Sequence, residues 1–171
     1  KLLKALEITE PGVINLVDRQ PPRCGHNEIL LKIKYIGFCG SDLSTYLGKN
    51  PLVNYPRIPG HEISAVIEEI GPGVPEKFKV GEHLTVDPYT HCGHCASCRR
   101  KRFNACKYNQ TLGVQREGAM SEYFVIPWQK VLQHNGLNDF QLALVEPLTV
   151  GFHAIDNVAV TDIDTVMILG C

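Results

Sequence analysis

The fold of this chain is decided by residues 60–74, which read GHEISAVIEEIGPGV. The β-branched run Ile63–Ile70 predicts a strand. Gly71-Pro72-Gly73 predicts the turn that ends this strand, because glycine and proline are the strongest local markers of turns. A histidine and a glutamate, His61 and Glu62, therefore stand at the start of an expected strand.

Three other segments carry similar strand signals. They are residues 29–36, Val80–Val86 and Glu122–Ile126. Alternation in residues 29–36 predicts one apolar face, made by Ile29, Leu31, Ile33 and Tyr35. Short strands separated by glycine and proline turns predict a compact, barrel-like β domain.

The pattern changes to helical spacing after Asn138. Apolar residues at this spacing predict two helices broken near Pro147, carrying Leu142, Leu144, Val145, Leu148, Phe152 and Ile155. The apolar run Thr165–Gly170 is then typical of the first buried strand of a parallel α/β sheet. We therefore expect one domain over residues 1–146 and the start of a second over 147–171.

Composition excludes several classes of protein. The chain has 171 residues, of which 44% are hydrophobic and 20% charged, as in an ordinary globular protein. A net charge of -1 gives no field that attracts nucleic acid or an anionic membrane. No apolar run approaches the roughly 20 residues that span a bilayer. The first residues lack both a methionine and the apolar block of a signal peptide, so we expect a trimmed or partial sequence.

Four cysteines at short spacing form the strongest local signal: Cys92-x2-Cys95-x2-Cys98-x7-Cys106. Such spacing lets tight turns direct four thiolates at one Zn²⁺ ion. Four thiolates leave no position for a substrate, so this site is expected to be structural. Seven cysteines, an odd number, also argue against a secreted disulfide framework and favour reduced thiols in the cytoplasm.

Three alternatives to this zinc site remain open. The basic run Arg99–Arg102 could be a nucleic-acid patch rather than a local counter-charge to the thiolates. The first three cysteine spacings also occur in iron–sulfur proteins. His91 and His94 lie inside the lobe and could replace a cysteine as ligand.

A second set of metal-binding residues is scattered along the chain. Cys39, His61, Glu62 and Glu146 together supply a thiolate, an imidazole and carboxylates, which suit a zinc site with one open position. A His-Glu-x-x-His protease motif is excluded because residue 65 is alanine.

In combination, these motifs resemble the zinc-containing medium-chain alcohol dehydrogenases. Residues 60–74 are similar to that family's signature Gly-His-Glu-x2-Gly-x5-Gly-x2-Val, with one departure at Ala65. Cys39-Gly40-Ser41-Asp42, the four cysteines and Glu146-Pro147-Leu148 follow in the family's order. The sorbitol and threonine dehydrogenases, which act on polyols and related alcohols, often carry the same Glu-Pro-Leu.

The resemblance implies a role for each residue of the second set. Cys39 and His61 would bind a catalytic zinc, with either Glu62 or Glu146 as third protein ligand. Ser41 would relay the alcohol proton and Asp42 would orient the zinc-bound histidine. Without that role, Ser41 and Asp42 would merely cap a helix running to Leu47.

The resemblance also implies the fold and the reaction. The expected fold is a β-rich (α+β) domain similar to the co-chaperonin GroES, followed by the truncated start of an α/β Rossmann domain. The parent protein would oxidise a small alcohol or polyol with NAD or NADP, and Tyr46 would contact that substrate. Gly170 would open the cofactor-binding turn. The chain alone is expected to be inactive.

The resemblance further implies a homodimer or homotetramer for the intact protein. Neither nucleic acid nor a membrane is an expected partner. The alternative function is a zinc-stabilised GroES-like binding module that has no catalytic activity.

Overall fold

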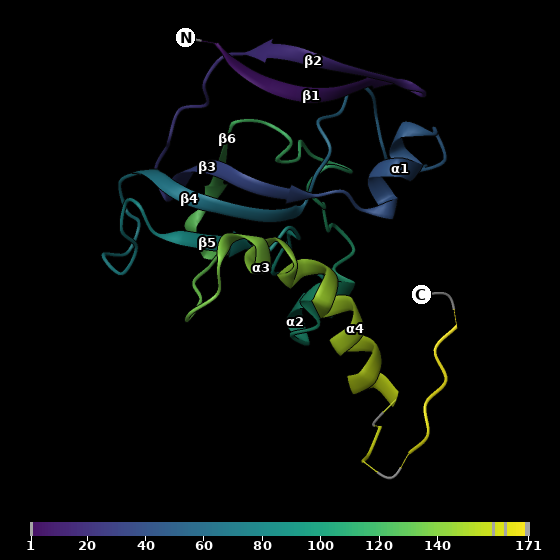
Figure 1. The fold of residues 1–171 in the computed structure, drawn as a ribbon. Helices are drawn as coiled ribbons and strands as arrows, with labels where there is room; N and C mark the ends of the chain where they lie inside the picture. The colour runs from purple at the N-terminus through teal and green to yellow at the C-terminus, as the bar shows by residue number, and fades with distance from the viewer. Residues whose placement is uncertain (1, 159, 163, 170–171) are drawn as a thin grey trace.

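Two antiparallel sheets form the framework of the molecule. The computed structural model describes residues 2–158, 160–162 and 164–169. In it β1 (Leu3–Glu10) and β2 (Val13–Arg19) make a hairpin that lies above the larger sheet in Figure 1. The larger sheet has the order β6-β3-β4-β5-β7. Its strands are β3 (Glu28–Gly37), β4 (Glu62–Ile70), β5 (His83–Val86), β6 (Tyr123–Pro127) and β7 (Val131–Leu132).

The expected strands are confirmed at three of four places. Residues 29–36, 63–70 and 122–126 correspond to β3, β4 and β6 within one residue at each end. The prediction for Val80–Val86 is too long, because β5 begins only at His83. Gly81 has a φ of 86° and donates its N–H to Ile67, so the chain turns there before it pairs.

A bulge in β3 changes which side chains face the core. The β3–β4 register shifts between Ile33 and Tyr35. Beyond this bulge Ile36 packs against the core, while Tyr35 is 51% exposed. The predicted face of residues 29–36 is therefore right up to Ile33 and wrong at Tyr35.

The core lies on the inward face of the large sheet. Side chains from β3, β4, β5 and β6 meet there, including Ile29, Leu31, Ile67, Leu84 and Ile126. A smaller cluster of Ala5, Ile58 and Met120 attaches the hairpin, with Val17 and Ile36 packed against it. This packing fixes the ends of β3 and β4, where the candidate site lies.

The helices are short except for the last. They are α1 (Gly40–Tyr46), α2 (Ala96–Arg99), α3 (Asp139–Ala143) and α4 (Val145–Val158), with 3₁₀ turns η1 (Phe103–Ala105) and η2 (Trp128–Lys130). Two helices after Asn138 are confirmed, but the break falls at Leu144. Pro147 lies in the first turn of α4, where its missing N–H costs no helical hydrogen bond.

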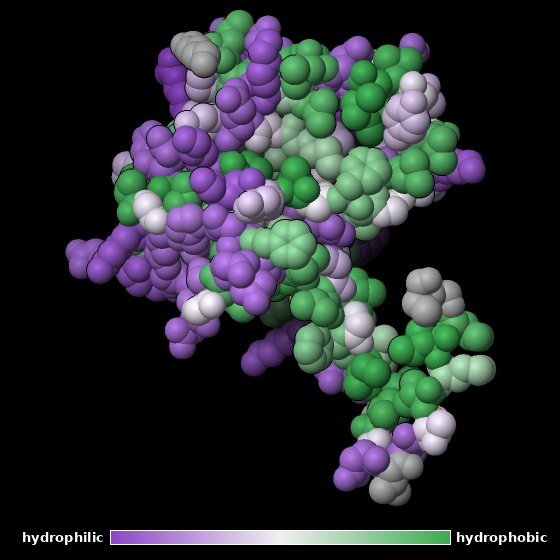
Figure 2. All heavy atoms as spheres, viewed as in Figure 1, coloured by the Kyte–Doolittle hydropathy of each residue, from purple (hydrophilic) through white to green (hydrophobic). Residues whose placement is uncertain are grey.

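The apolar side chains of α4 and of the segment after it face outwards. Leu148, Phe152 and Ile168 are 58%, 69% and 76% exposed. Hydrophobic residues accordingly gather on α4 and the following segment in Figure 2. The predicted strand Thr165–Gly170 is not formed over residues 164–169, since a strand needs hydrogen-bonding neighbours and none pairs with them in the described part of the chain. Gly170 lies outside the described residues.

A search of the described residues for membrane-crossing segments gives a negative result. No helix there combines the length and the hydropathy that a bilayer requires.

Candidate metal centres

The ends of β3 and β4 bring three metal-binding side chains together. Ligand atoms of Cys39, His61 and Glu62 all lie within 4.8 Å of one another. Cys39 directly precedes α1 and is separated from the end of β3 by Phe38, whereas Glu62 is the first residue of β4. Because Gly37 pairs with Glu62 across the sheet, the thiol and the carboxyl meet at the same edge.

Two glycines make room for this arrangement. A Cβ at Gly37 would lie 1.9 Å from Oε2 and 2.8 Å from Cβ of Glu62, so the glutamate side chain occupies the space that another residue would fill. Gly60 has a φ of 98°, a backbone conformation that side-chain-bearing residues rarely adopt. It turns the chain immediately before His61 and Glu62.

Asp42 fastens the two ligand-bearing segments to each other. Its Oδ2 accepts a hydrogen bond from Cys39 N at 3.0 Å, and its Oδ1 accepts one from Gly60 N at 3.1 Å. The carboxylate is only 1% exposed and lies 3.9 Å from Nδ1 of His61. Asp42 thus contributes to the cap of α1 and also holds the segment that carries His61. Its predicted role in orienting a zinc-bound histidine stays a prediction.

Two buried polar atoms beside the cluster lack a hydrogen bond. They are Oγ of Ser41 and Nδ1 of His61, neither of which finds a partner among the described residues. Buried polar groups are normally paired, so atoms left without a partner beside metal-binding side chains indicate a site for a bound group. The donor set of thiol, imidazole and carboxyl fits zinc.

Glu146 reaches the edge of this cluster from α4 but is not part of it. The group that could hold a metal contains Glu62 and omits Glu146. Instead, Oε1 of Glu146 accepts a hydrogen bond from the hydroxyl of Tyr89 at 2.7 Å. The sequence offered no motif around Tyr89, and this functional candidate was missed.

Burial and neighbouring charges shift the pKa values of Glu62 and Tyr89. Burial raises the pKa of Glu62, with a further increase from Glu146 and a decrease from His61. Burial, the hydrogen bond to Glu146 and the charge of Cys39 raise the pKa of Tyr89, which therefore stays protonated at neutral pH. Glu62 and Tyr89 are therefore electrostatic neighbours of the thiol of Cys39, and Glu146 is a neighbour of both Glu62 and Tyr89.

The four-cysteine lobe forms a second group. The sulfurs of Cys92, Cys95, Cys98 and Cys106 lie within 4.8 Å of one another, and the last two residues are buried. Backbone N–H groups of Cys95 and Tyr108 donate to the sulfurs of Cys92 and Cys106, each at 3.3 Å. N–H donors directed at sulfur favour thiolates, and the four-sulfur set fits a structural zinc.

The thiols of the lobe differ in acidity. Backbone hydrogen bonds from Cys98 and Lys107 lower the pKa of Cys95 to about 6. Burial and the hydrogen bond with Cys95 raise the pKa of Cys98. The histidines of the lobe stay out of the group, because Nδ1 of His94 lies 2.9 Å from the carbonyl oxygen of Cys92 and the ring of His91 stacks on Phe103 at 4.5 Å.

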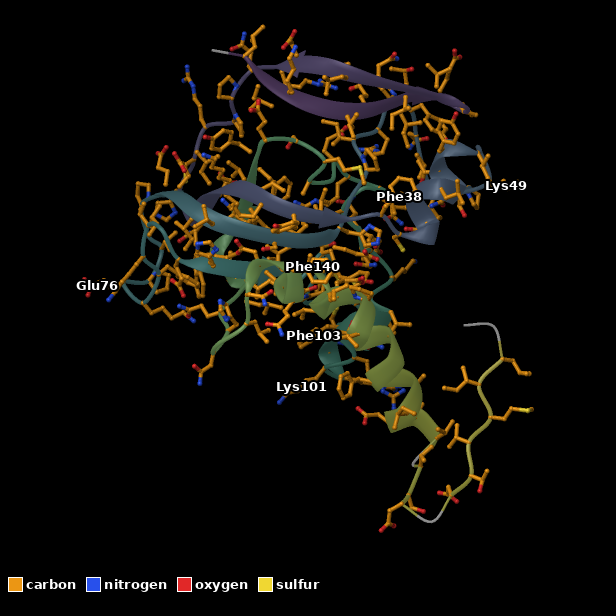
Figure 3. All side chains as sticks on the ribbon, in the orientation of Figure 1. Phe38, Lys49, Glu76, Lys101, Phe103 and Phe140 are labelled. Carbon is orange, nitrogen blue, oxygen red and sulfur yellow. The ribbon has the colours of Figure 1, made fainter. Side chains whose placement is uncertain are left out.

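A cavity of about 640 Å³ lies between the lobe and α4. Tyr89, His91 and Phe103 line it from one side, and Thr149 and His153 from α4. Phe103 is labelled in Figure 3 next to α4 and close to Lys101 of the lobe. Tyr89 therefore lines this cavity and also binds Glu146.

Tyr46, the residue predicted to contact the substrate, lies at the end of α1. It comes one turn after Asp42 and is partly buried. Its backbone carbonyl accepts a hydrogen bond from Gly12. Its contact with a substrate stays a prediction.

Comparison with known proteins gives one family and a consistent set of relatives. A family model described as alcohol dehydrogenase GroES-like domain matches residues 25–136. The starvation-sensing protein RspB of Escherichia coli (strain K12) is 36% identical over 169 residues, which are 98% of this chain and 50% of that protein. A sorbitol dehydrogenase of Halalkalibacterium halodurans is 36% identical over 173 residues, with 98% and 50% covered.

Solved structures agree with the sequence matches. A crystal structure of the alcohol dehydrogenase rspB from E. coli CFT073, complexed with the cofactor NADH, superposes with a TM-score of 0.88 at 34% identity. The match covers 96% of this chain and 48% of that one. The chain thus spans about half the length of the curated relatives it matches.

Proposed function

The chain belongs to the alcohol dehydrogenase GroES-like domain family, as residues 60–74 predict, and from this we propose that it forms the zinc-binding part of a dehydrogenase. The intact protein would oxidise a small alcohol or polyol, with NAD or NADP as hydride acceptor. Relatives named as sorbitol, threonine and galactonate dehydrogenases support this class of substrate.

One observation carries the proposal. Donor atoms of Cys39, His61 and Glu62 converge within 4.8 Å although the residues are up to 23 positions apart, and neither Nδ1 of His61 nor the buried hydroxyl of Ser41 has a hydrogen-bond partner among the described residues. A structural zinc site usually closes its fourth position with another protein ligand. Three protein donors leave the fourth position of a metal free, which favours a site that takes a substrate oxygen.

Zinc bound there would supply Lewis acidity, which polarises a hydroxyl and lowers its pKa. Cys39 and His61 would be two of its ligands and Glu62 the third. A thiolate and a carboxylate would balance the two positive charges of the ion, since the imidazole is neutral as a ligand.

The other residues of the site would position groups and move a proton. Oγ of Ser41, buried and without a hydrogen-bond partner among the described residues, would relay the proton of the substrate hydroxyl, taking it up as it passes its own hydroxyl proton on towards solvent. Asp42 holds Cys39 and Gly60 through their backbone N–H groups, and so fixes both ligand-bearing segments. Such fixed positioning of reacting groups is a large part of enzymatic rate enhancement.

The four-cysteine lobe would hold a second, structural zinc. Four sulfurs complete a tetrahedral shell, so this metal would have no place for substrate. The basic residues Arg99–Arg102 would then act as local counter-charges to the thiolates.

Metal analysis of the purified chain tests this function against its alternatives. Two zinc ions per chain, reduced to one by His61→Ala, are expected for the dehydrogenase. One zinc, unaffected by His61→Ala, would support the binding module that lacks catalytic activity. A brown protein containing iron would instead support an iron–sulfur cluster.

We extend the proposal to the compartment, the domain boundaries and the oligomeric state of the protein. The six cysteines described by the structure are free thiols, which favours a reducing compartment such as the cytoplasm. We also propose that residues 1–146 form the catalytic domain, that residues 147–171 lead into the cofactor domain, and that the intact protein is a homodimer or homotetramer.

A further inference from the structure

Tyr89 lines the cavity beside the lobe and binds Glu146 at the start of α4. The tyrosine hydroxyl donates to Oε1 of Glu146 at 2.7 Å. This is the one hydrogen bond that the Glu146 carboxylate makes within the described residues, although Glu146 is only 7% exposed. A buried carboxylate needs such a partner, so the contact fixes where the carboxylate points.

Hydrogen bonds fix the positions of both Tyr89 and Glu146. The N–H of Tyr89 donates to Oδ1 of Asp87 at 3.0 Å, and Tyr89 forms an isolated β-bridge with Thr111. Asp87 is itself paired with Lys130 at 2.6 Å. Glu146 lies in the first turn of α4, where its carbonyl accepts the hydroxyl of Thr149. The hydrogen bond therefore joins two anchored groups.

The carboxylate of Glu146 could compete with a substrate for the metal, and its hydrogen bond to Tyr89 prevents this. Cys39 and Glu62 already balance the charge of a zinc ion. If Glu146 also became a ligand, the site would gain a negative charge and lose the position that a substrate oxygen needs. Helix α4, which carries Glu146 in its first turn, contacts β4, which begins with Glu62, and the charge of Glu146 also raises the pKa of Glu62.

We propose that Tyr89 is a positioning residue that holds Glu146 away from the metal, so that the fourth position stays open. The inference rests on the proposed function, because it requires a metal at Cys39, His61 and Glu62. It assigns no proton transfer to Tyr89.

Cobalt substitution of the full chain tests this role directly. In the Tyr89→Phe variant Glu146 is released and can bind the metal. Visible absorption of Co²⁺ at this centre should then lose intensity, as expected when a fifth ligand joins a four-coordinate ion. Affinity for Co²⁺ in a chelator competition should rise roughly tenfold, the size of one hydrogen bond to a charged group. The four-cysteine lobe contributes equally to both spectra and cancels in the difference.

Two variants make the test specific. Tyr55→Phe is the matched control, because it removes another partly buried tyrosine hydroxyl, one that donates to the carbonyl of Thr45. It should leave the cobalt spectrum unchanged. Adding Glu146→Gln to Tyr89→Phe should restore the original spectrum, since the amide is a poor ligand. A purely structural role for Tyr89 would change stability and leave the spectrum as it was.

The outcomes separate this inference from the function on which it rests. An unchanged spectrum and affinity in Tyr89→Phe, in a chain that binds two metals, would overturn the role of Tyr89 alone. If Tyr89→Phe does not fold, the cobalt spectrum of Glu146→Gln is the test of the proposal. An unchanged spectrum supports the proposal, whereas the change in spectrum that Glu62→Gln produces would contradict it. A chain that binds only one metal would remove the proposed function as well.

Discussion

Gly37 determines how Glu62 reaches the thiol of Cys39. Glu62 fills the volume next to the Gly37 backbone, and the strand register keeps these two residues opposite each other. Gly40, three residues further on, has no atom within 4 Å of the place that a Cβ would take. The two glycines therefore differ in whether a methyl group displaces a metal-binding side chain.

Gly37→Ala should weaken metal binding at the Cys39 cluster by about tenfold, within the usual range for displacing groups that position metal ligands. Gly40→Ala is the control and should bind metal normally. Both affinities can be measured by competition with a chelator. Equal affinities of the two variants would show that Glu62 does not depend on the space at Gly37.

At the scale of elements, Asp42 couples helix α1 to strand β4. Asp42 is the third residue of α1 and bonds both to the residue before the helix and to the turn that precedes β4. Helix α3 has a similar cap at Asn138, which accepts a hydrogen bond from Gln141 N at 2.9 Å. Asn138 is exposed, and its hydrogen bond stays within the first turn of α3, away from the segments that carry Cys39 and His61.

Asp42→Ala should destabilise the chain by about 2–4 kcal/mol, since it removes a cap and leaves a buried N–H of Gly60 unpaired. Asn138→Ala should cost about 1 kcal/mol, as a simple cap does. Urea denaturation measures both values. Metal content at the Cys39 cluster should fall only in Asp42→Ala, and a similar loss in Asn138→Ala would argue against the special role of Asp42.

The four-cysteine lobe is an element whose order should depend on its metal. Its only regular structure is one turn of α2 and the turn η1. Residues 99–102 are already exposed, so removing zinc with a chelator should unfold the backbone around these trypsin sites and accelerate cleavage there by roughly tenfold or more. Lys32, within β3, is the internal control and should remain uncut. Equal cleavage with and without zinc would mean that the sulfurs do not order the lobe.

At the scale of the whole molecule, stability comes from the sheet and not from α4. Most of the largest fully buried side chains lie on the strands, whereas α4 extends away from the sheet in Figure 1. Ile67 is 1% exposed and Phe152 is 69% exposed. The two side chains should thus differ strongly in what they contribute to unfolding.

Ile67→Ala should lower the free energy of unfolding by about 2–5 kcal/mol, the range for deleting a large buried side chain. Phe152→Ser should change it by about 0.5 kcal/mol or less, as exposed substitutions do. Urea titration of the chain gives both numbers. A large loss in Phe152→Ser would show that α4 packs against the sheet.

Much of the strand pattern and of the ligand set could be predicted from the sequence. Runs of β-branched residues gave β3, β4 and β6, and cysteine spacing gave the lobe. The bulge before Tyr35 could not be predicted, because it depends on pairing with β4. The first hairpin was missed, although Pro11-Gly12 between apolar runs marks its turn.

The long-range contacts of the site were beyond sequence reasoning. Local spacing says nothing about which carboxylate of Glu62 and Glu146 stands nearer to Cys39, since β4 and α4 place them independently. Tyr89 carries no motif, and only the fold brings its hydroxyl to Glu146. Three-dimensional contacts of this kind arise from packing between distant segments.

Anomalous diffraction at the zinc edge, from crystals of the zinc-loaded chain, tests the central claim most directly. The account predicts two zinc peaks per chain, one among the four sulfurs and one touching Cys39, His61 and Glu62 with Glu146 held by Tyr89. A single peak, confined to the four-cysteine lobe in a zinc-saturated crystal, would contradict it.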